Sequence, residues 1–243
     1  LSRAQFHRAR DHQRKLAEGA TDPAKMPDRN LALEALVEVL EGKRVVHHHT
    51  HRQDDILTVL RLQQEFGFRC VLHHVSEGGL VAEQIAAANV PCSVIVIDSP
   101  GGKLEAARLS LTTGAVLDRA GVLVGFHTDD GITDSRLFLR SAALAVRAGM
   151  DRDKALQAVT IANARMLDLQ ERVGSLAPGK DADFVVLSGD PFSVYTRVLQ
   201  TWVEGKKVFD FAEPRDRLLA VGGYGASDDQ AMSLCCYGGQ GGQ

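Results

Sequence analysis

Histidines dominate the part of this sequence that could do chemistry. Four of the nine histidines of the 243-residue chain lie within five consecutive residues, at His47, His48, His49 and His51. Because alternate residues of a β-strand point to the same side, a strand here would point His47, His49 and His51 the same way. Imidazole groups gathered in this manner are typical ligands of a divalent metal ion. The spacing therefore predicts a metal site.

Two further candidate ligands, His74 and Asp129, follow other strand-like segments. A divalent ion bound by imidazole and carboxylate groups needs them to converge from different strands. We therefore predict His49, His74 and Asp129 as ligands of a divalent metal ion of the zinc type; the alternative is that these groups lie in solvent-facing loops. Such an ion lowers the pKa of bound water towards about 7, while a nearby carboxylate takes the water's proton. Asp129 is predicted for that catalytic role.

Neighbouring residues leave alternatives open. Only one of the adjacent strand residues His73 and His74 can face the same side, so His73 is the alternative ligand. Asp130 is the alternative to Asp129, although a carboxylate at this position also suits the start of a helix. Three residues just beyond the predicted ligands are candidates for substrate binding, and for the two charged ones solvation at a loop is the alternative. These residues are His51, Arg52 and Glu77.

The elements that would position these residues form a repeating strand–helix series. The predicted strands are 44–50, 69–74, 92–97 and 122–126, and the predicted helices are 54–66, 80–88, 103–120 and 134–148. Apolar strands alternating with helices that have one apolar face imply parallel strands covered by helices. The polar candidates follow the strands, and barrel enzymes build their sites at the carboxyl ends of parallel strands. We therefore predict an α/β fold that contains the later four βα units of a partial (β/α)8 TIM-type barrel.

The periodicity changes in the last third of the chain. A turn-rich connector over residues 174–183 leads to three short strand-like segments, 184–187, 197–203 and 207–211, of which the last two form a hairpin. A Gly-rich segment ends the chain. The predicted parts are the half barrel over residues 1–165, a connector and the return strands of a small β-sandwich over residues 166–212, and a flexible tail over residues 213–243.

Composition excludes several classes of protein. The chain has 44% apolar and 24% charged residues and a formal charge of -3, as in a soluble globular protein. It has no basic stripe for nucleic acid and no polybasic segment for a membrane surface. No apolar segment approaches the roughly 18 residues of a membrane span, and the start lacks a signal peptide. We therefore predict a cytoplasmic protein that acts on a small molecule. The sequence does not begin with Met, and we hypothesise from this that the chain is a fragment.

Four segments carry a family resemblance. They are His49–Ile56 (HTHRQDDI), His74–Gly78 (HVSEG), Thr128–Asp129 and Gly174–Leu187 (GSLAPGKDADFVVL). Together they resemble the amidohydrolase superfamily, close to its imidazolonepropionase-like and prolidase-like branches, over roughly residues 28–210. The resemblance implies a metal-dependent hydrolase of carbon–nitrogen bonds. It makes His49 the fifth-strand ligand, His74 the sixth-strand ligand, and Asp129 the eighth-strand ligand and general base.

The sequence departs from the family pattern in two ways. The family's first-strand His-x-His pair and fourth-strand Lys or Glu have no counterpart here, so the resemblance covers only the C-terminal half of the enzyme. Deaminases and imidazolonepropionases of the family carry Glu three residues after the fifth-strand His, where this chain has Arg52. We therefore expect an amide, a dipeptide-like bond or a lactam ring as the substrate.

A competing hypothesis accepts the same fold but not the activity. In this alternative the chain is a catalytically inactive truncated fragment, or a subunit that binds a partner supplying the first half of the barrel. A half barrel leaves two unpaired strand edges and an exposed apolar surface, which favour association. We therefore expect the isolated chain to form homo-oligomers, to aggregate, or to need the missing N-terminal half.

Overall fold

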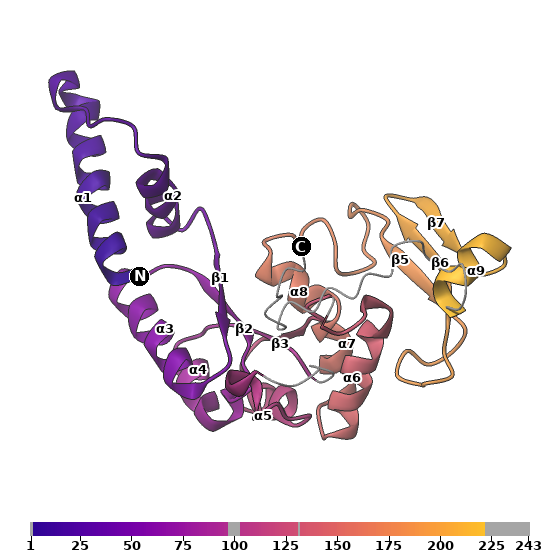
Figure 1. Ribbon diagram of the computed structural model, residues 1–243. Coiled ribbons are helices and arrows are strands. Elements are labelled where there is room, and N and C mark those ends of the chain that lie inside the picture. Colours follow the sequence, from indigo (N-terminus) through magenta and orange to yellow (C-terminus); the bar gives the residue numbers. More distant parts are fainter. Residues whose placement is uncertain (1, 97–102, 131, 222–243) are drawn as a thin grey trace, which may run out of the picture.

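A computed structural model describes residues 2–96, 103–130 and 132–221 (Figure 1). It contains a parallel sheet in the order β1-β2-β3-β4 and a separate antiparallel sheet in the order β5-β6-β7. The parallel strands are β1 (Val46–Thr50), β2 (Cys70–His74), β3 (Cys92–Val94) and β4 (Val124–Phe126). The predicted α/β fold with four parallel strands is confirmed. The described strands form an open sheet with β1 and β4 at its edges, so they do not close into a barrel.

Helices connect the parallel strands, as the series predicts. They are α3 (Gln53–Phe66), the 3-10 turn η2 (Gly78–Val81) with α4 (Ala82–Ala87), η3 (Leu104–Ala106) with α5 (Thr113–Arg119), and η4 (Ser135–Leu137) with α6 (Phe138–Arg147). The short helices α7 (Arg152–Ala158) and α8 (Ile161–Met166) follow and contact β4. The strand predicted to extend to Ile97 ends at Val94 within the described residues.

The core lies between one face of the parallel sheet and the helices. Ile56 of α3, Ile85 of α4 and Leu117 of α5 pack with Leu72 of β2 and Phe126 of β4, and each is at most 1% exposed. In α3 the buried residues recur at helical spacing, and Gly67 ends the helix with the left-handed conformation that favours glycine. Burial of this face against helices leaves the opposite face of the sheet for polar residues.

Strand register places a row of polar and small residues on that opposite face. His49 pairs with His73, His73 with Ser93, and Ser93 with Gly125 across the four strands. His47 lies two residues before His49 and so points to the same side. The predicted alternation of the histidines in β1 therefore fits the register of the sheet.

The single helix predicted over residues 103–120 is wrong. The structure has the short turn η3 and then α5, separated by residues 107–112. The Ser110 hydroxyl accepts a hydrogen bond from the Thr112 backbone N–H, and the two hydroxyls are also bonded to each other. Such local side-chain bonds compete with helix formation. As a result residues 103–112 form a loop with one turn of 3-10 helix.

Two helices precede the sheet. Figure 1 shows α1 (Ser2–Thr21) and α2 (Leu31–Leu40) side by side, projecting beyond β1. The first helix docks through Phe6, whose ring stacks on Phe66 and Phe68. Asn30 caps the second helix by accepting a hydrogen bond from the backbone N–H of Leu33.

The C-terminal part is a single three-stranded sheet within the described residues, where the sequence predicts part of a β-sandwich. Its strands are β5 (Phe184–Leu187), β6 (Val198–Val203) and β7 (Lys206–Asp210). The predicted hairpin joins the last two, with Glu204 and Gly205 both at positive φ. A helix, α9 (Pro214–Val221), stands where the sequence predicts the start of a flexible tail, and the rest of that tail lies outside the described residues. Of the described helices, none has the length and apolar character needed to cross a bilayer.

Candidate metal centre

Three histidines from two neighbouring strands converge at the carboxyl end of the parallel sheet. His49, His51 and His74 each offer a ring nitrogen, and these atoms lie within 4.8 Å of one another. The His74 ring centroid is 4.4 Å from that of His49 and 4.7 Å from that of His51. The structure thus brings together two predicted ligands, His49 and His74. It adds His51, which the sequence predicts as a substrate contact.

Hydrogen bonds fix the rings of two of these histidines. His51 Nδ1 lies 2.6 Å from Ser76 Oγ, and His74 Nδ1 lies 3.1 Å from His127 Nε2. His127 Nδ1 is in turn 2.9 Å from Ser93 Oγ. Metal-binding histidines use one ring nitrogen for the ion and hold the other in such a bond. The arrangement therefore leaves Nε2 of His51 and Nε2 of His74 as ligand atoms.

The buried histidines are held in the neutral form that binds metal. Burial lowers the pKa of His51 to about 4, and that of His74 to about 2. Neighbouring imidazoles contribute to both of these shifts, because a second positive charge close by disfavours protonation. At neutral pH each ring therefore keeps a nitrogen lone pair available for an ion. This donor set fits a divalent cation such as zinc.

Backbone conformations at the strand ends are unusual. His74, Val75 and Asp129 have φ of 68°, 44° and 52°, in the left-handed region. A β-branched residue such as Val75 is rare there, and such positions cost about 1–3 kcal/mol each. Hydrogen bonds from Val75 N to Thr50 O and His73 O hold the turn. The left-handed turn ends the regular alternation of β2, and His74 joins the group of His49 and His51 although His73 is the residue that pairs with His49.

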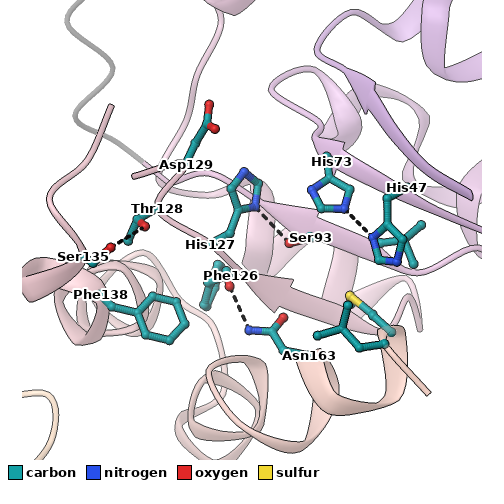
Figure 2. Close-up of a pocket in the computed structure, with 13 residues that line it drawn as sticks. His47, His73, Ser93, Phe126, His127, Thr128, Asp129, Ser135, Phe138 and Asn163 are labelled. Atoms are coloured by element: carbon teal, nitrogen blue, oxygen red, sulfur yellow. Dashed lines mark hydrogen bonds between the residues drawn. The ribbon is translucent and has the colours of Figure 1, made fainter. Parts of the chain in front are cut away.

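A second histidine pair lines an adjoining cavity of about 410 Å³. His47 Nδ1 lies 2.8 Å from His73 Nε2, and the His127 ring lies between this pair and His74 (ring centroids 5.3 Å from His73 and 4.8 Å from His74). Figure 2 shows this cavity with His47, His73 and His127 on one side and Asn163 of α8 below them. A substrate bound here would contact His73 and His127, whose rings lie beside His74.

Asp129 lies beyond His127 at the end of β4 and lines the same cavity (Figure 2). Its side chain is exposed, and among the described residues it is not part of the group whose ligand atoms meet. Its negative charge nevertheless acts on His51 and His73, where it favours the protonated form. Asp129 therefore lies close enough to influence the cluster electrostatically, and its role as ligand and base stays a prediction. Asp130, the alternative, accepts a hydrogen bond from Ser135 N.

Two predicted substrate contacts have structural partners instead. Arg52 is exposed, and its Nε bonds Asp54 Oδ1 at 3.0 Å. Glu77 is only 8% exposed, and its Oε2 accepts a hydrogen bond from Gln53 N at the start of α3. A carboxylate there satisfies a free N–H group and suits the positive end of the helix. Both remain predictions as substrate contacts.

A further pair, Lys103 and Glu105, lies against this centre and was not predicted from the sequence. Glu105 Oε1 is 3.0 Å from His49 Nε2, and Lys103 Nζ is 2.6 Å from Glu105 Oε1. Burial opposes ionisation of Glu105, but hydrogen bonds with Lys103 and His49 outweigh it and lower the pKa of its carboxyl to about 2. The available signal was their place just after the third strand, because loops at this end of a parallel sheet carry functional residues.

The family model for the amidohydrolase family matches residues 13–209. The chain belongs to the amidohydrolase family. A solved amidohydrolase from Thermotoga maritima MSB8 is 32% identical and superposes with a TM-score of 0.80 over 86% of this chain. Amidohydrolase tasK of Hapsidospora irregularis is 29% identical over 185 residues, or 74% of this chain. A 5-methylthioadenosine/S-adenosylhomocysteine deaminase of Teredinibacter turnerae is 32% identical over 46% of this chain.

This family member is short beside its relatives. The matched regions cover 54% of the Thermotoga maritima chain, 19% of the Hapsidospora irregularis protein and 31% of the Teredinibacter turnerae protein. An adenosine deaminase from Xanthomonas campestris with bound zinc shares the fold, with a TM-score of 0.54 at 22% identity over 72% of this chain and 48% of that chain.

Proposed function

We propose that this amidohydrolase family member hydrolyses a carbon–nitrogen bond with water activated by a divalent metal ion. The observation that carries the proposal is the convergence of His49, His51 and His74, with two of the three rings oriented through Nδ1. When bound, such an ion would supply a nucleophile at neutral pH and polarise the bond to be cleaved. Zinc is the proposed ion, because imidazole ligands suit it.

Different residues of this chain would bind the ion, orient its ligands and transfer the proton. His51 and His74 hold the ion through Nε2, while Ser76 and His127 keep those rings in place. We assign to Asp129 the transfer of a proton from water to the leaving nitrogen, since its charge reaches the cluster and its side chain lines the cavity. The cavity beside His73 and His127 would take the substrate.

The proposed substrate is an amide, a dipeptide-like bond or a lactam ring. Arg52, which stands where deaminases of the family carry Glu, supports hydrolysis of such a bond over deamination. A second candidate is deamination of an aminopurine, because curated relatives include proteins named adenine deaminase, one 38% identical over 37% of this chain. Activity on either class would support the proposed chemistry.

We also propose that further barrel strands complete the site. The edges β1 and β4 are open among the described strands, and the matched Thermotoga maritima chain is almost twice as long as the part this chain covers. The missing strands would come from an N-terminal half or from a partner chain, including a second copy. We expect the isolated 243-residue chain to associate, and static light scattering that shows a stable monomer would contradict this.

Metal analysis tests the proposal most directly. We expect the chain to bind zinc, and His49→Ala and His74→Ala each to reduce bound metal strongly. His48→Ala is the matched control: His48 directly precedes His49 in β1, and its ring bonds the backbone oxygen of His49. A wild-type chain that binds no divalent metal would refute the metal site. A hydrolysis panel of amides, dipeptides, lactams and aminopurines, run with any partner half present, then identifies the substrate class.

A further inference from the structure

We propose that Glu105 is a carboxylate ligand of the metal centre and that Lys103 competes with the ion for it. This inference rests on the proposed metal site and extends it. It would add one carboxylate, which contacts His49, to the group of His49, His51 and His74.

The distance between Glu105 and His49 fits shared coordination of one ion. Zinc binds imidazole nitrogen and carboxylate oxygen at about 2.0–2.2 Å, so two such ligands lie about 2.9 Å apart at a right angle and about 3.3 Å apart at the tetrahedral angle. Glu105 Oε1 is 3.0 Å from His49 Nε2, within this range. In the absence of an ion the same pair forms a hydrogen bond, so the carboxylate is already placed at a ring nitrogen of His49.

The ammonium group of Lys103 lies where a cation would make the same contacts. Its Nζ is 2.6 Å from Glu105 Oε1 and 3.3 Å from His49 Nε2. The charges of Lys103 and Glu105 also act on His51, so both lie close to the second imidazole of the group. The Lys103 ammonium group is bonded to the Glu105 carboxylate and lies near two imidazoles, so this position favours a cation.

Three imidazoles and one carboxylate would fill the four positions of a tetrahedral zinc ion. Water would then bind as a fifth ligand or in exchange for Glu105, because catalytic zinc keeps one position for water and sometimes expands to five ligands. One negative charge among the ligands also offsets part of the charge of the ion. Lys103 would weaken metal binding, because the ion must displace the ammonium group from Glu105.

Metal affinity measured with paired variants tests this directly. Co²⁺ and Zn²⁺ binding to the 243-residue chain would be measured by competition with a chromophoric chelator, and the visible spectrum of the Co²⁺-bound protein would report the ligand set. Glu105→Gln should lower affinity at least about tenfold and change the Co²⁺ spectrum. Lys103→Met should raise affinity, because it removes the competitor. Glu83→Gln, an exposed carboxylate on α4, is the control and should change neither.

The two variants should change metal affinity in opposite directions. A Lys103–Glu105 pair with a purely structural role would not produce this result. If Glu105→Gln keeps wild-type affinity and spectrum while His49→Ala loses the metal, the role of Glu105 is refuted and the proposed metal site stands. If Lys103→Met weakens binding as much as Glu105→Gln, with unchanged circular dichroism, the competition is refuted. A wild-type chain that binds neither ion would overturn the metal site and this inference together.

Discussion

Gly125 is the position where a single added carbon should disturb the site most. It lies in β4, on the sheet face that carries the histidines, and a Cβ there would come within 2.0 Å of Asn163 Oδ1 and 3.1 Å of Met166 Cε. The Asn163 amide cannot simply turn away, because its Nδ2 donates a 2.9 Å hydrogen bond to Phe126 O (Figure 2). Gly125→Ala must therefore break this bond and push α8 off β4.

The expected cost follows from these contacts. Overpacking a filled site costs about 1–3 kcal/mol, and loss of the hydrogen bond about 1 kcal/mol, so we expect Gly125→Ala to destabilise by roughly 2–4 kcal/mol. Asn163→Ala alone should cost about 1–2 kcal/mol. In the double variant the added methyl enters the space left by the amide, so its cost should fall at least about 1 kcal/mol below the sum of the single changes.

Urea unfolding followed by far-ultraviolet circular dichroism measures these values. Gly79→Ala is the matched control: its Cβ would lie 3.6 Å from Val116 Cγ1, an ordinary contact, and it should cost little. Additive effects of Gly125→Ala and Asn163→Ala, or a cost of Gly125→Ala no larger than that of the control, would refute the close packing of α8 on β4.

Two further changes test the residues that hold the centre in place. Ser76→Ala removes the group that orients His51, and we expect metal affinity to fall about 10–100-fold with little change in the urea midpoint; unchanged affinity would contradict the orienting role. Glu77→Ala removes the acceptor for Gln53 N, and urea unfolding should show a loss of about 0.5–2 kcal/mol; wild-type stability would argue against this capping bond.

Much of the scaffold could be predicted from sequence because its signals are local. Apolar strands and amphipathic helices alternate along the chain, and that pattern is enough to give four parallel strands with helices between them. The alternation of His47, His49 and His51 follows from the two-residue period of a strand. The same rule alone does not select His74, because regular backbone pairs His73, not His74, with His49. His74 was predicted from its place before the loop, and it joins the group after the backbone turns left-handed at His74 and Val75.

The contact between Glu105 and His49 could not be predicted from the sequence for a different reason. The segment around it has helical periodicity, and a continuous helix would carry Glu105 on the outer surface. Bonds between Ser110 and Thr112 interrupt that helix, and the remaining loop returns to His49, which is 56 residues earlier in the chain. This contact depends on the order of the strands in the sheet, and the spacing of residues within the segment does not predict it.

The arrangement of the histidines at the end of the sheet depends on one register of β1 against β2. His49 faces His73 only while Val46 pairs with Cys70 and Thr50 pairs with His74. A slip of one residue would exchange the faces of the strand, turning His48 and Thr50 inward and sending the other three imidazoles towards the helices. An insertion or deletion of one residue within β1 would thus separate the converging imidazoles without replacing any histidine. A change of two residues would keep the imidazoles on the same face of the sheet and only move them along the strand.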